Sequence, residues 1–189
     1  PARTVIVRAA DARGLDAALE ASPLSVETVV QEERRGTGHA VLQAKEKLAD
    51  FSGDLLVLYG DAPLAEAETM HALLAAQHTA LAPALVVLGM RPDDLGEYGR
   101  LIADINGLLI SIIEHRDASR EQRDEETLCN AGPIAGSAEL IFELLSEVGS
   151  DNVKGEYYLT DIIGLARGRG LDCAVVETDA TEAAGVNSR

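Results

Sequence analysis

The amino-acid sequence predicts an α/β fold in which a doubly wound, mostly parallel sheet carries an antiparallel addition. Short apolar runs without polar alternation recur through the first half of the chain, as expected for strands that are covered on both faces. Segments with helical spacing separate these runs, and such alternation is typical of a parallel sheet. In the second half, an Asn106-Gly107 pair between two apolar runs indicates a β-hairpin.

The first half alternates strands with helices. A β-branched strand opens the chain, and the helix after it has Leu15, Ala18 and Leu19 on one face. Ser22-Pro23 ends this helix, and Pro63 prevents further pairing after the third strand. The same two periodicities predict strands at 4–8, 26–30, 54–58 and 84–90, and helices at 11–21, 40–49 and 65–77.

The second half is expected to begin with the hairpin. A charged stretch at 117–126 follows, which we interpret as a solvated helix or a lid. The next strand is interrupted by Asn130-Ala131-Gly132, because Asn and Gly are depleted in strands. Gly168 or Gly170 stops the last helix. The expected elements are hairpin strands at 100–105 and 108–114, strands at 127–135 and 174–177, and helices at 137–148 and 159–167.

Length and composition limit the classes of function. The 189 residues fit a single domain spanning the whole chain, with an aliphatic core and no Trp for base stacking. Acidic residues outnumber basic ones by 32 to 16, so a nucleic-acid backbone would be repelled. No apolar run reaches the roughly 18 residues that span a bilayer, so a membrane is not expected as a partner. Cys129 and Cys173, far apart and outside any CxxC, are typical of a reduced cytoplasmic protein.

Asp61 is the first candidate functional residue. It follows a strand that ends at Tyr59-Gly60, and ligands of open α/β sheets bind at the carboxyl ends of the strands. Its carboxylate is a hard oxygen ligand that could hold Mg²⁺ against the phosphates of a ligand. Alternatively, Asp61 caps the helix that is expected to begin near Ala65.

A second polar cluster combines Gln31 with Gly36-Thr37-Gly38-His39. Two glycines before a helix allow a backbone to approach a ligand, and the helix N-terminus offers unpaired N–H groups. The Gln31 amide could match the edge of a pyrimidine ring, since it carries a donor and an acceptor. The alternative is a tight turn without a ligand, with His39 in the first turn of the helix.

Further polar residues lie at the ends of expected elements, and each has a structural alternative. Gly99 is either a turn glycine or offers its N–H to a sugar or phosphate. Glu114 is either an exposed strand end or an acceptor for sugar hydroxyls. Asn130 is unusual within a strand, and Thr160 or Asp161 could cap a helix. Their shared placement at element ends favours one assembled site.

These motifs, taken as an ordered set, resemble the uridyltransferase domain of bifunctional N-acetylglucosamine-1-phosphate uridyltransferases (GlmU). The set comprises GTGHA, LYGDAPL, YGR, IIEHRDA, NAG, GEYYLTD and GVNSR. The resemblance implies a Rossmann-like nucleotidyltransferase fold that joins UTP and N-acetylglucosamine 1-phosphate, with Mg²⁺, into UDP-N-acetylglucosamine and pyrophosphate. The product serves peptidoglycan synthesis in the cell wall. In this family, assembly as a homotrimer belongs to the other half of the protein.

The resemblance also implies roles for particular residues. Gln31, Gly36 and Thr37 would contact the uridine base. Asp61 and Asn187 would hold Mg²⁺ and serve catalysis. The remaining residues that it implies in substrate binding are Tyr59, Gly60, Gly99, Glu114, Asn130, Tyr157 and Thr160.

The sequence departs from this family in three places. The family opens with a glycine-rich loop carrying an Arg, followed by a Pro-Lys pair, and these cradle the triphosphate. The sequence has neither, so we expect a domain without its first strand and this loop, and weak or absent turnover. NAG stands where the family has NTG, and the β-helix acetyltransferase domain is missing. Two other functions stay open: transfer of a nucleotide to another sugar phosphate, and non-catalytic binding of a nucleotide sugar.

Overall fold

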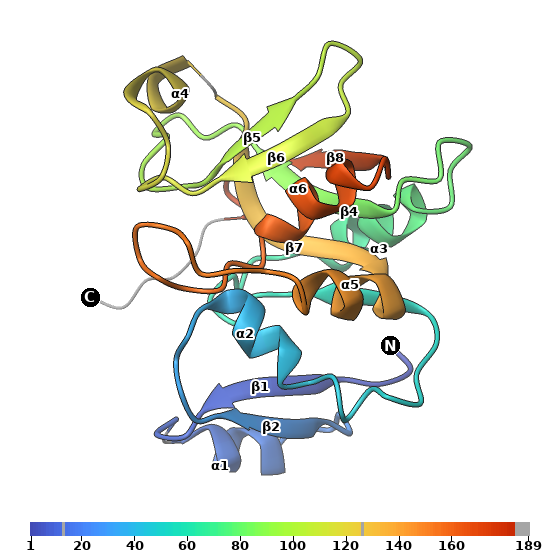
Figure 1. Ribbon diagram of the computed structural model, residues 1–189. Helices are drawn as coiled ribbons and strands as arrows, with labels where there is room; N and C mark the ends of the chain where they lie inside the picture. Colours follow the sequence, from blue (N-terminus) through green and yellow to red (C-terminus); the bar gives the residue numbers. More distant parts are fainter. Residues whose placement is uncertain (13, 126, 184–189) are drawn as a thin grey trace.

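Two β-sheets organise the computed structural model, which describes residues 1–12, 14–125 and 127–183 (Figure 1). The smaller sheet pairs β1 (Val5–Ala9) in parallel with β2 (Glu27–Gln31). The larger sheet has the order β6-β5-β7-β4-β8, and β3 also pairs with β7. Its strands are β3 (Asp54–Val57), β4 (Leu85–Met90), β5 (Arg100–Ala103), β6 (Leu109–Ile113), β7 (Cys129–Ser137) and β8 (Cys173–Thr178).

Strand β7 runs against its neighbours. It is antiparallel to β3, β4 and β5, whereas β4 and β8 are parallel. Ile134 lies opposite both Val57 of β3 and Val87 of β4, so β7 separates two strands that point the same way. The predicted mixed α/β class is confirmed. The antiparallel part extends beyond the expected hairpin, because β7 itself belongs to it.

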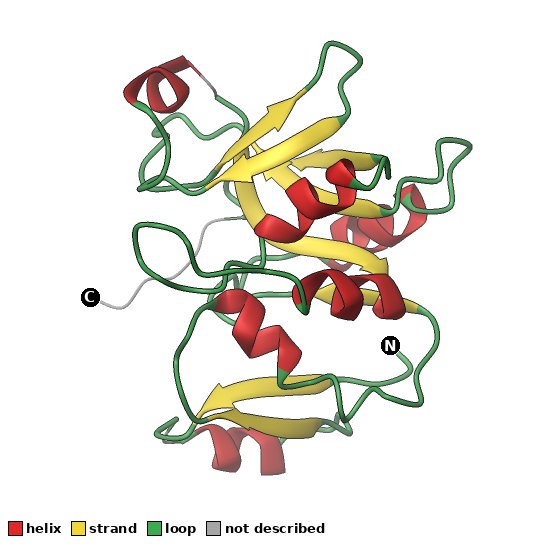
Figure 2. Cartoon of the chain, in the orientation of Figure 1, coloured by secondary structure: helices red, strands yellow, loops and turns green. Residues whose placement is uncertain are grey.

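Helices cover both faces of the larger sheet (Figure 2). α5 (Ala138–Leu145) and α6 (Asp161–Gly168) lie on one face, and α3 (Ala67–Ala76) lies on the other. Successive residues of β4 point to opposite faces: Leu85 packs in the core cluster of α5 and α6, and Val86 packs with Leu73 of α3. The unbroken apolar run of β4 is therefore explained by burial on both faces.

Several element boundaries differ from the predicted ones. α1 (Leu15–Glu20) is shorter than expected, and α2 (Thr37–Leu42) begins three residues early and ends in a series of turns. β7 is one strand through Asn130-Ala131-Gly132, although its pairing with β4 shifts register between Asn130 and Ile134 and its pairing with β3 begins only at Ile134. The charged stretch contains the short helix α4 (Arg120–Glu125). The predicted hairpin is confirmed, with Gly107 at a φ of +82° in its turn.

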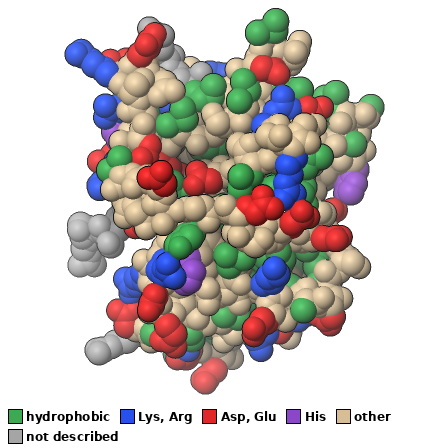
Figure 3. Space-filling model, viewed as in Figure 1, with side chains coloured by type: hydrophobic (Ala, Val, Ile, Leu, Met, Phe, Trp, Pro, Cys, Tyr) green, Lys and Arg blue, Asp and Glu red, His purple; other side chains and the backbone are tan. Residues whose placement is uncertain are grey.

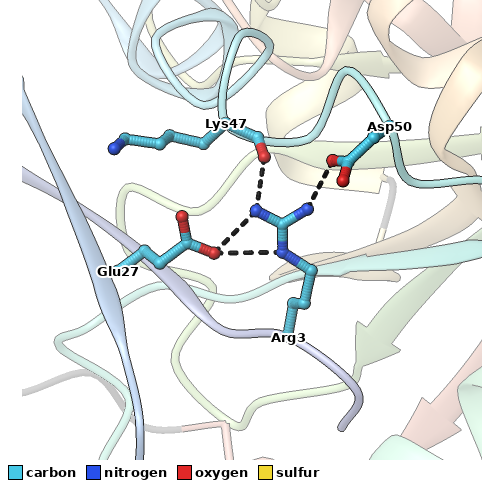
Figure 4. Close-up of polar contacts among 4 residues, drawn as sticks. All are labelled: Arg3, Glu27, Lys47 and Asp50. Atoms are coloured by element: carbon cyan, nitrogen blue, oxygen red, sulfur yellow. Dashed lines mark hydrogen bonds and ion pairs between the residues drawn. The ribbon is translucent and has the colours of Figure 1, made fainter.

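The Arg3 guanidinium joins the smaller sheet to the segment that precedes β3 (Figure 4). Its Nε and Nη2 atoms donate to Glu27 Oε1 at 3.0 and 2.7 Å. Nη1 donates to Asp50 Oδ1 at 2.7 Å, and Nη2 also donates to the Lys47 carbonyl oxygen at 2.6 Å. One side chain thus connects the segment before β1 with β2 and with the turns after α2.

The surface is acidic, in keeping with a net charge of −16. On the face shown in Figure 3, acidic side chains are spread over the upper and lower halves instead of forming a single patch. Among the described residues, every helix is too short or too polar to span a lipid bilayer.

Candidate functional site

The segment at 35–38 is hydrogen-bonded to the segment at 157–159. The Tyr157 N–H donates to the Arg35 carbonyl oxygen at 2.8 Å, and the Gly38 N–H donates to the Tyr157 carbonyl oxygen at 2.8 Å. The Leu159 N–H donates to Thr37 Oγ1 at 2.9 Å across 122 residues of sequence. These bonds hold the start of α2 against the chain that enters α6. We call this pair of segments the clamp.

The clamp explains why the residue at position 36 is a glycine. A Cβ atom at this position would lie 2.5 Å from the Tyr157 carbonyl oxygen and 2.8 Å from its nitrogen, and the φ of Gly36 is +111°. A side chain here would therefore be excluded by both space and backbone conformation. The approach of this backbone to a ligand stays a prediction; in the structure, the backbone that comes close to Gly36 is that of Tyr157.

Gln31, at the end of β2, turns its amide nitrogen toward the start of α2. Nε2 donates to the Gly36 carbonyl oxygen at 3.2 Å and lies 2.9 Å from His39 Nδ1. The Arg35 guanidinium lies 4.9 Å from the centre of the Tyr157 ring and donates to its hydroxyl at 2.9 Å. This end of the clamp therefore gathers Gln31, Gly36 and Tyr157, three of the predicted site residues.

Tyr59, just after β3, links the clamp to the middle of the sheet. Its ring lies against Gly132 of β7, where a Cβ atom would come within 2.7 Å of Tyr59 Cδ2. Burial raises the pKa of Tyr59 to about 12; the charges of Glu114 and Asp61 also raise it, and a hydrogen bond with Thr37 opposes them. The phenol therefore stays neutral at physiological pH, between two acidic side chains.

Asp61 does not cap α3. The N-cap position of that helix is Glu66, five residues further along, and the Glu66 N–H donates to Glu182 Oε1 at 2.8 Å. The cap alternative for Asp61 is therefore wrong. Gly60 and Asp61 are exposed after the end of β3. Asn187, the second predicted Mg²⁺ ligand, lies outside the described residues. Within those residues, no group of three or more His, Cys, Asp or Glu side chains could hold a metal ion.

Glu114 and Thr160 form the other end of the site. The Thr160 hydroxyl donates to Glu114 Oε1 at 2.9 Å, although Thr160 stands at the N-cap position of α6 and makes no capping hydrogen bond there. Beside them, an open cavity of about 220 Å³ is lined by Glu114, Asp117, Tyr158 and Asp161, among others. Burial, together with the charges of Glu114 and Asp117, raises the pKa of Asp161.

Asn130 and Gly99 are neighbours across β7 and the start of β5. The Asn130 N–H donates to the Gly99 carbonyl oxygen at 2.8 Å, and Asn130 Oδ1 accepts a hydrogen bond from the Gly132 N–H at 3.0 Å. Gly99 is buried. The backbone contact near Asn130 thus involves Gly132 of the NAG motif.

Three residues shape this site although the sequence offered no reason to assign them a role in it. The Tyr59 ring packs against Gly132. The only hint of this in the sequence was a glycine two residues after Asn130 within an expected strand. Tyr158 is 6% exposed beside the acidic side chains, and burial with the Asp117 charge raises its pKa to about 12. His39 lies in the first turn of α2, as predicted, but its contact with Gln31 depends on how β2 meets α2.

Curated relatives align with the whole chain. The bifunctional protein GlmU of Rhodospirillum rubrum is 51% identical over 190 residues, which cover 100% of this chain and 41% of the relative. The GlmU of Zymomonas mobilis is 43% identical and is covered to 42%. The chain thus spans about two fifths of the length of the curated relatives it matches. No family model matches the chain.

Solved structures share the fold. A UDP-glucose pyrophosphorylase complexed with UDP-glucose superposes with a TM-score of 0.67 at 16% identity, over 92% of this chain and 72% of that one. The inositol-1-phosphate CTP transferase from T. maritima gives a TM-score of 0.69 at 12% identity, over 94% and 66%. These structures show a Rossmann-like nucleotidyltransferase fold. Along its whole length, the chain is thus similar to part of the curated proteins named bifunctional protein GlmU.

Proposed function

We propose that this chain carries the nucleotidyl-transfer site of a UDP-N-acetylglucosamine pyrophosphorylase. Its substrates would be UTP and N-acetylglucosamine 1-phosphate, and its products UDP-N-acetylglucosamine and pyrophosphate. The relatives are GlmU proteins, and the structural neighbours are named for UDP-glucose and CTP chemistry. The described site supports the same reaction class.

The clamp is the observation that carries this proposal. It holds Gln31, Gly36 and Thr37 beside the segment that leads to Thr160, and Thr160 contacts Glu114. The residues that the resemblance implies in base binding are thereby held next to those that it implies in sugar binding. A reaction between two anionic substrates needs such positioning more than it needs a protein nucleophile.

In the proposed reaction, an oxygen of the sugar phosphate attacks the α-phosphorus of UTP. A new bond forms between that oxygen and the α-phosphorus, the bond to the bridging β-phosphate oxygen breaks, and pyrophosphate leaves. Gln31 and the backbone near Gly36 would bind the base. Glu114, Asn130 and Thr160 would orient the sugar, and Tyr59 would contribute a neutral hydroxyl and exclude water. A sugar that left these polar groups unpaired would be rejected.

Asp61 and Asn187 are proposed as the Mg²⁺ ligands. One carboxylate and one carboxamide fit an ion that prefers oxygen and binds phosphates through its remaining positions. When bound, the ion would neutralise phosphate charge. The Glu66 N–H donates to Glu182 Oε1 at 2.8 Å, so the chain five residues after Asp61 lies beside the chain five residues before Asn187.

The extent of the domain is part of the proposal. Among the described residues, β1 pairs only with β2, and β3 pairs only with β7, so each of these two strands has one side without a strand partner. Val5 and Val7 of β1 nevertheless pack against the main core cluster. We propose that one further strand and its glycine-rich loop complete the triphosphate site.

The test is pyrophosphate release from UTP and N-acetylglucosamine 1-phosphate, measured for this chain with and without the N-terminal segment of the R. rubrum relative. We expect weak turnover without the segment and a large gain with it. Near-normal turnover of the chain alone would contradict the need for the added strand and loop. A panel of other nucleotides and sugar phosphates checks the choice of substrates.

Calorimetry with UDP-N-acetylglucosamine, with and without Mg²⁺, separates the enzyme from a non-catalytic binding module. Metal-independent binding without turnover, even with the added segment, would favour the module and overturn the proposed reaction.

A further inference from the structure

The Gln31 amide is held in one orientation by two acceptors. Nε2 lies 3.2 Å from the Gly36 carbonyl oxygen, which can only accept, so the NH₂ group faces inward. The same nitrogen lies 2.9 Å from His39 Nδ1. This second contact is a hydrogen bond only if Nδ1 carries no proton. The neutral His39 ring must then carry its proton on Nε2.

A neutral imidazole accepts at only one of its two ring nitrogens, so the contact of His39 with Gln31 competes with a contact to Gln43. Gln43 Nε2 lies 3.3 Å from His39 Nε2, but it donates to the His39 carbonyl oxygen at 3.0 Å and so has a partner of its own. The shorter of the two ring contacts is the one to Gln31. The Tyr157 ring lies beside the imidazole, with 6.3 Å between ring centroids.

Both amide protons of Gln31 are thus used within the protein. The described residues give no hydrogen bond to Gln31 Oε1, so the group that remains for a ligand is an acceptor. We propose that His39 is a positioning residue that presents Gln31 Oε1 outward and so selects a pyrimidine with a ring N–H. This inference rests on the proposed function, in which Gln31 contacts the base.

The selection follows from base chemistry. Uracil carries a proton on N3 and can donate to an outward-facing carbonyl oxygen. The N3 atom of cytosine is an acceptor, so it would oppose Gln31 Oε1 and leave two acceptors unpaired. A site built in this way rejects the wrong base mainly through that unpaired group.

The experiment compares UDP and CDP binding by calorimetry for the parent chain, His39→Leu, His39→Asn and a matched control, His71→Leu. His71 is exposed on α3 and has no hydrogen bond among the described contacts. We expect the parent to prefer UDP, and His39→Leu to reduce the UDP:CDP affinity ratio by about fivefold or more, the value of one lost hydrogen bond. His39→Asn should restore most of the ratio, because its side-chain oxygen can accept where Nδ1 did. His71→Leu should leave the ratio unchanged.

A His39→Leu chain that keeps the parent ratio would overturn the inference while leaving the proposed function intact. If the parent binds neither nucleotide, the base site of the proposed function fails, and the ¹⁵N spectrum of the His39 ring decides the inference separately. We expect the proton on Nε2 and an unprotonated Nδ1. A proton on Nδ1 would refute it.

Discussion

The Thr160 hydroxyl donates a hydrogen bond to Glu114 Oε1 at 2.9 Å, joining the start of α6 to the end of β6. Thr160 is only 2% exposed, so replacing it with Val leaves a carboxylate oxygen without this partner. We expect Thr160→Val to lower the free energy of unfolding by about 1–3 kcal/mol, as for a lost bond to a charged group. Urea denaturation measures the change.

The matched control is Thr160→Ser, which keeps the hydroxyl and should retain most of the stability. Equal losses in the two variants would show that the methyl group of Thr160, not its hydrogen bond, stabilises this end of the site.

A side chain at Gly36 should open the clamp. Gly36→Ala would place Cβ 2.5 Å from the Tyr157 carbonyl oxygen. We expect a loss of stability of more than about 2 kcal/mol, combining a positive-φ penalty with displaced backbone. The control is Gly107→Ala, since Gly107 also has a positive φ but no atom within 4 Å of the place that an added Cβ would take. Thermal unfolding of both variants isolates the clash; equal losses would contradict it.

The charged form of Glu182 should stabilise the folded protein at neutral pH. Burial raises its pKa, but hydrogen bonds from Thr178, the Glu66 N–H and Thr69 together hold the pKa below its ordinary value of 4.5. The folded state therefore favours the charged form, and this stabilisation is lost as pH falls through the folded pKa. We expect Glu182→Gln to be less stable than the parent at pH 7 and nearly equal to it well below pH 4.5.

The control for this pH series is Glu20→Gln, which removes an exposed carboxylate that has no hydrogen bond among the described contacts. It should change stability little at either pH. A Glu182→Gln deficit of the same size at both pH values would mean that shape, not charge, matters at this position.

Asp161 should change the pH dependence of stability in the direction opposite to Glu182. Burial, then the charges of Glu114 and Asp117, raise its pKa above the ordinary value of 3.8. The folded state therefore disfavours the charged form, and stability is lost as pH rises from about 3.8 through the folded pKa. We expect Asp161→Asn to be more stable than the parent at pH 7 and to have no advantage below pH 3.8. A less stable variant at pH 7 would show that the helix dipole outweighs the neighbouring charges.

The sequence was sufficient for elements whose signal is local. The Asn106-Gly107 hairpin and the buried run of β4 were predicted because turn chemistry and apolar periodicity act within a few residues. The direction of β7 was not predictable, since it depends on pairing with β3 and β4 from distant parts of the chain. Pairing with Gly89 of β4 and a hydrogen bond to the Gly99 carbonyl oxygen also override the low strand propensity of Asn130.

The candidate site shows the same division. Position after a strand identified Asp61, but excluding its role as a cap required the actual start of α3 at Ala67. Thr37 was expected in the site, but its hydrogen bond with the Leu159 N–H joins residues 122 positions apart. The spacing of nearby residues could not predict this contact. The contact between His39 of α2 and Gln31 at the end of β2 depends on how these two elements are placed, which local sequence spacing does not predict.

Arg35, Thr37 and Gly38 are hydrogen-bonded to residues 157–159. The amino-terminal third of the chain is therefore not expected to fold as an independent nucleotide-binding domain. A truncated version ending before residue 150 would have to leave the start of α2 facing solvent. Conversely, two separately expressed pieces broken within the exposed α4 stretch could reassemble through these bonds, and ligand affinity would then report their association.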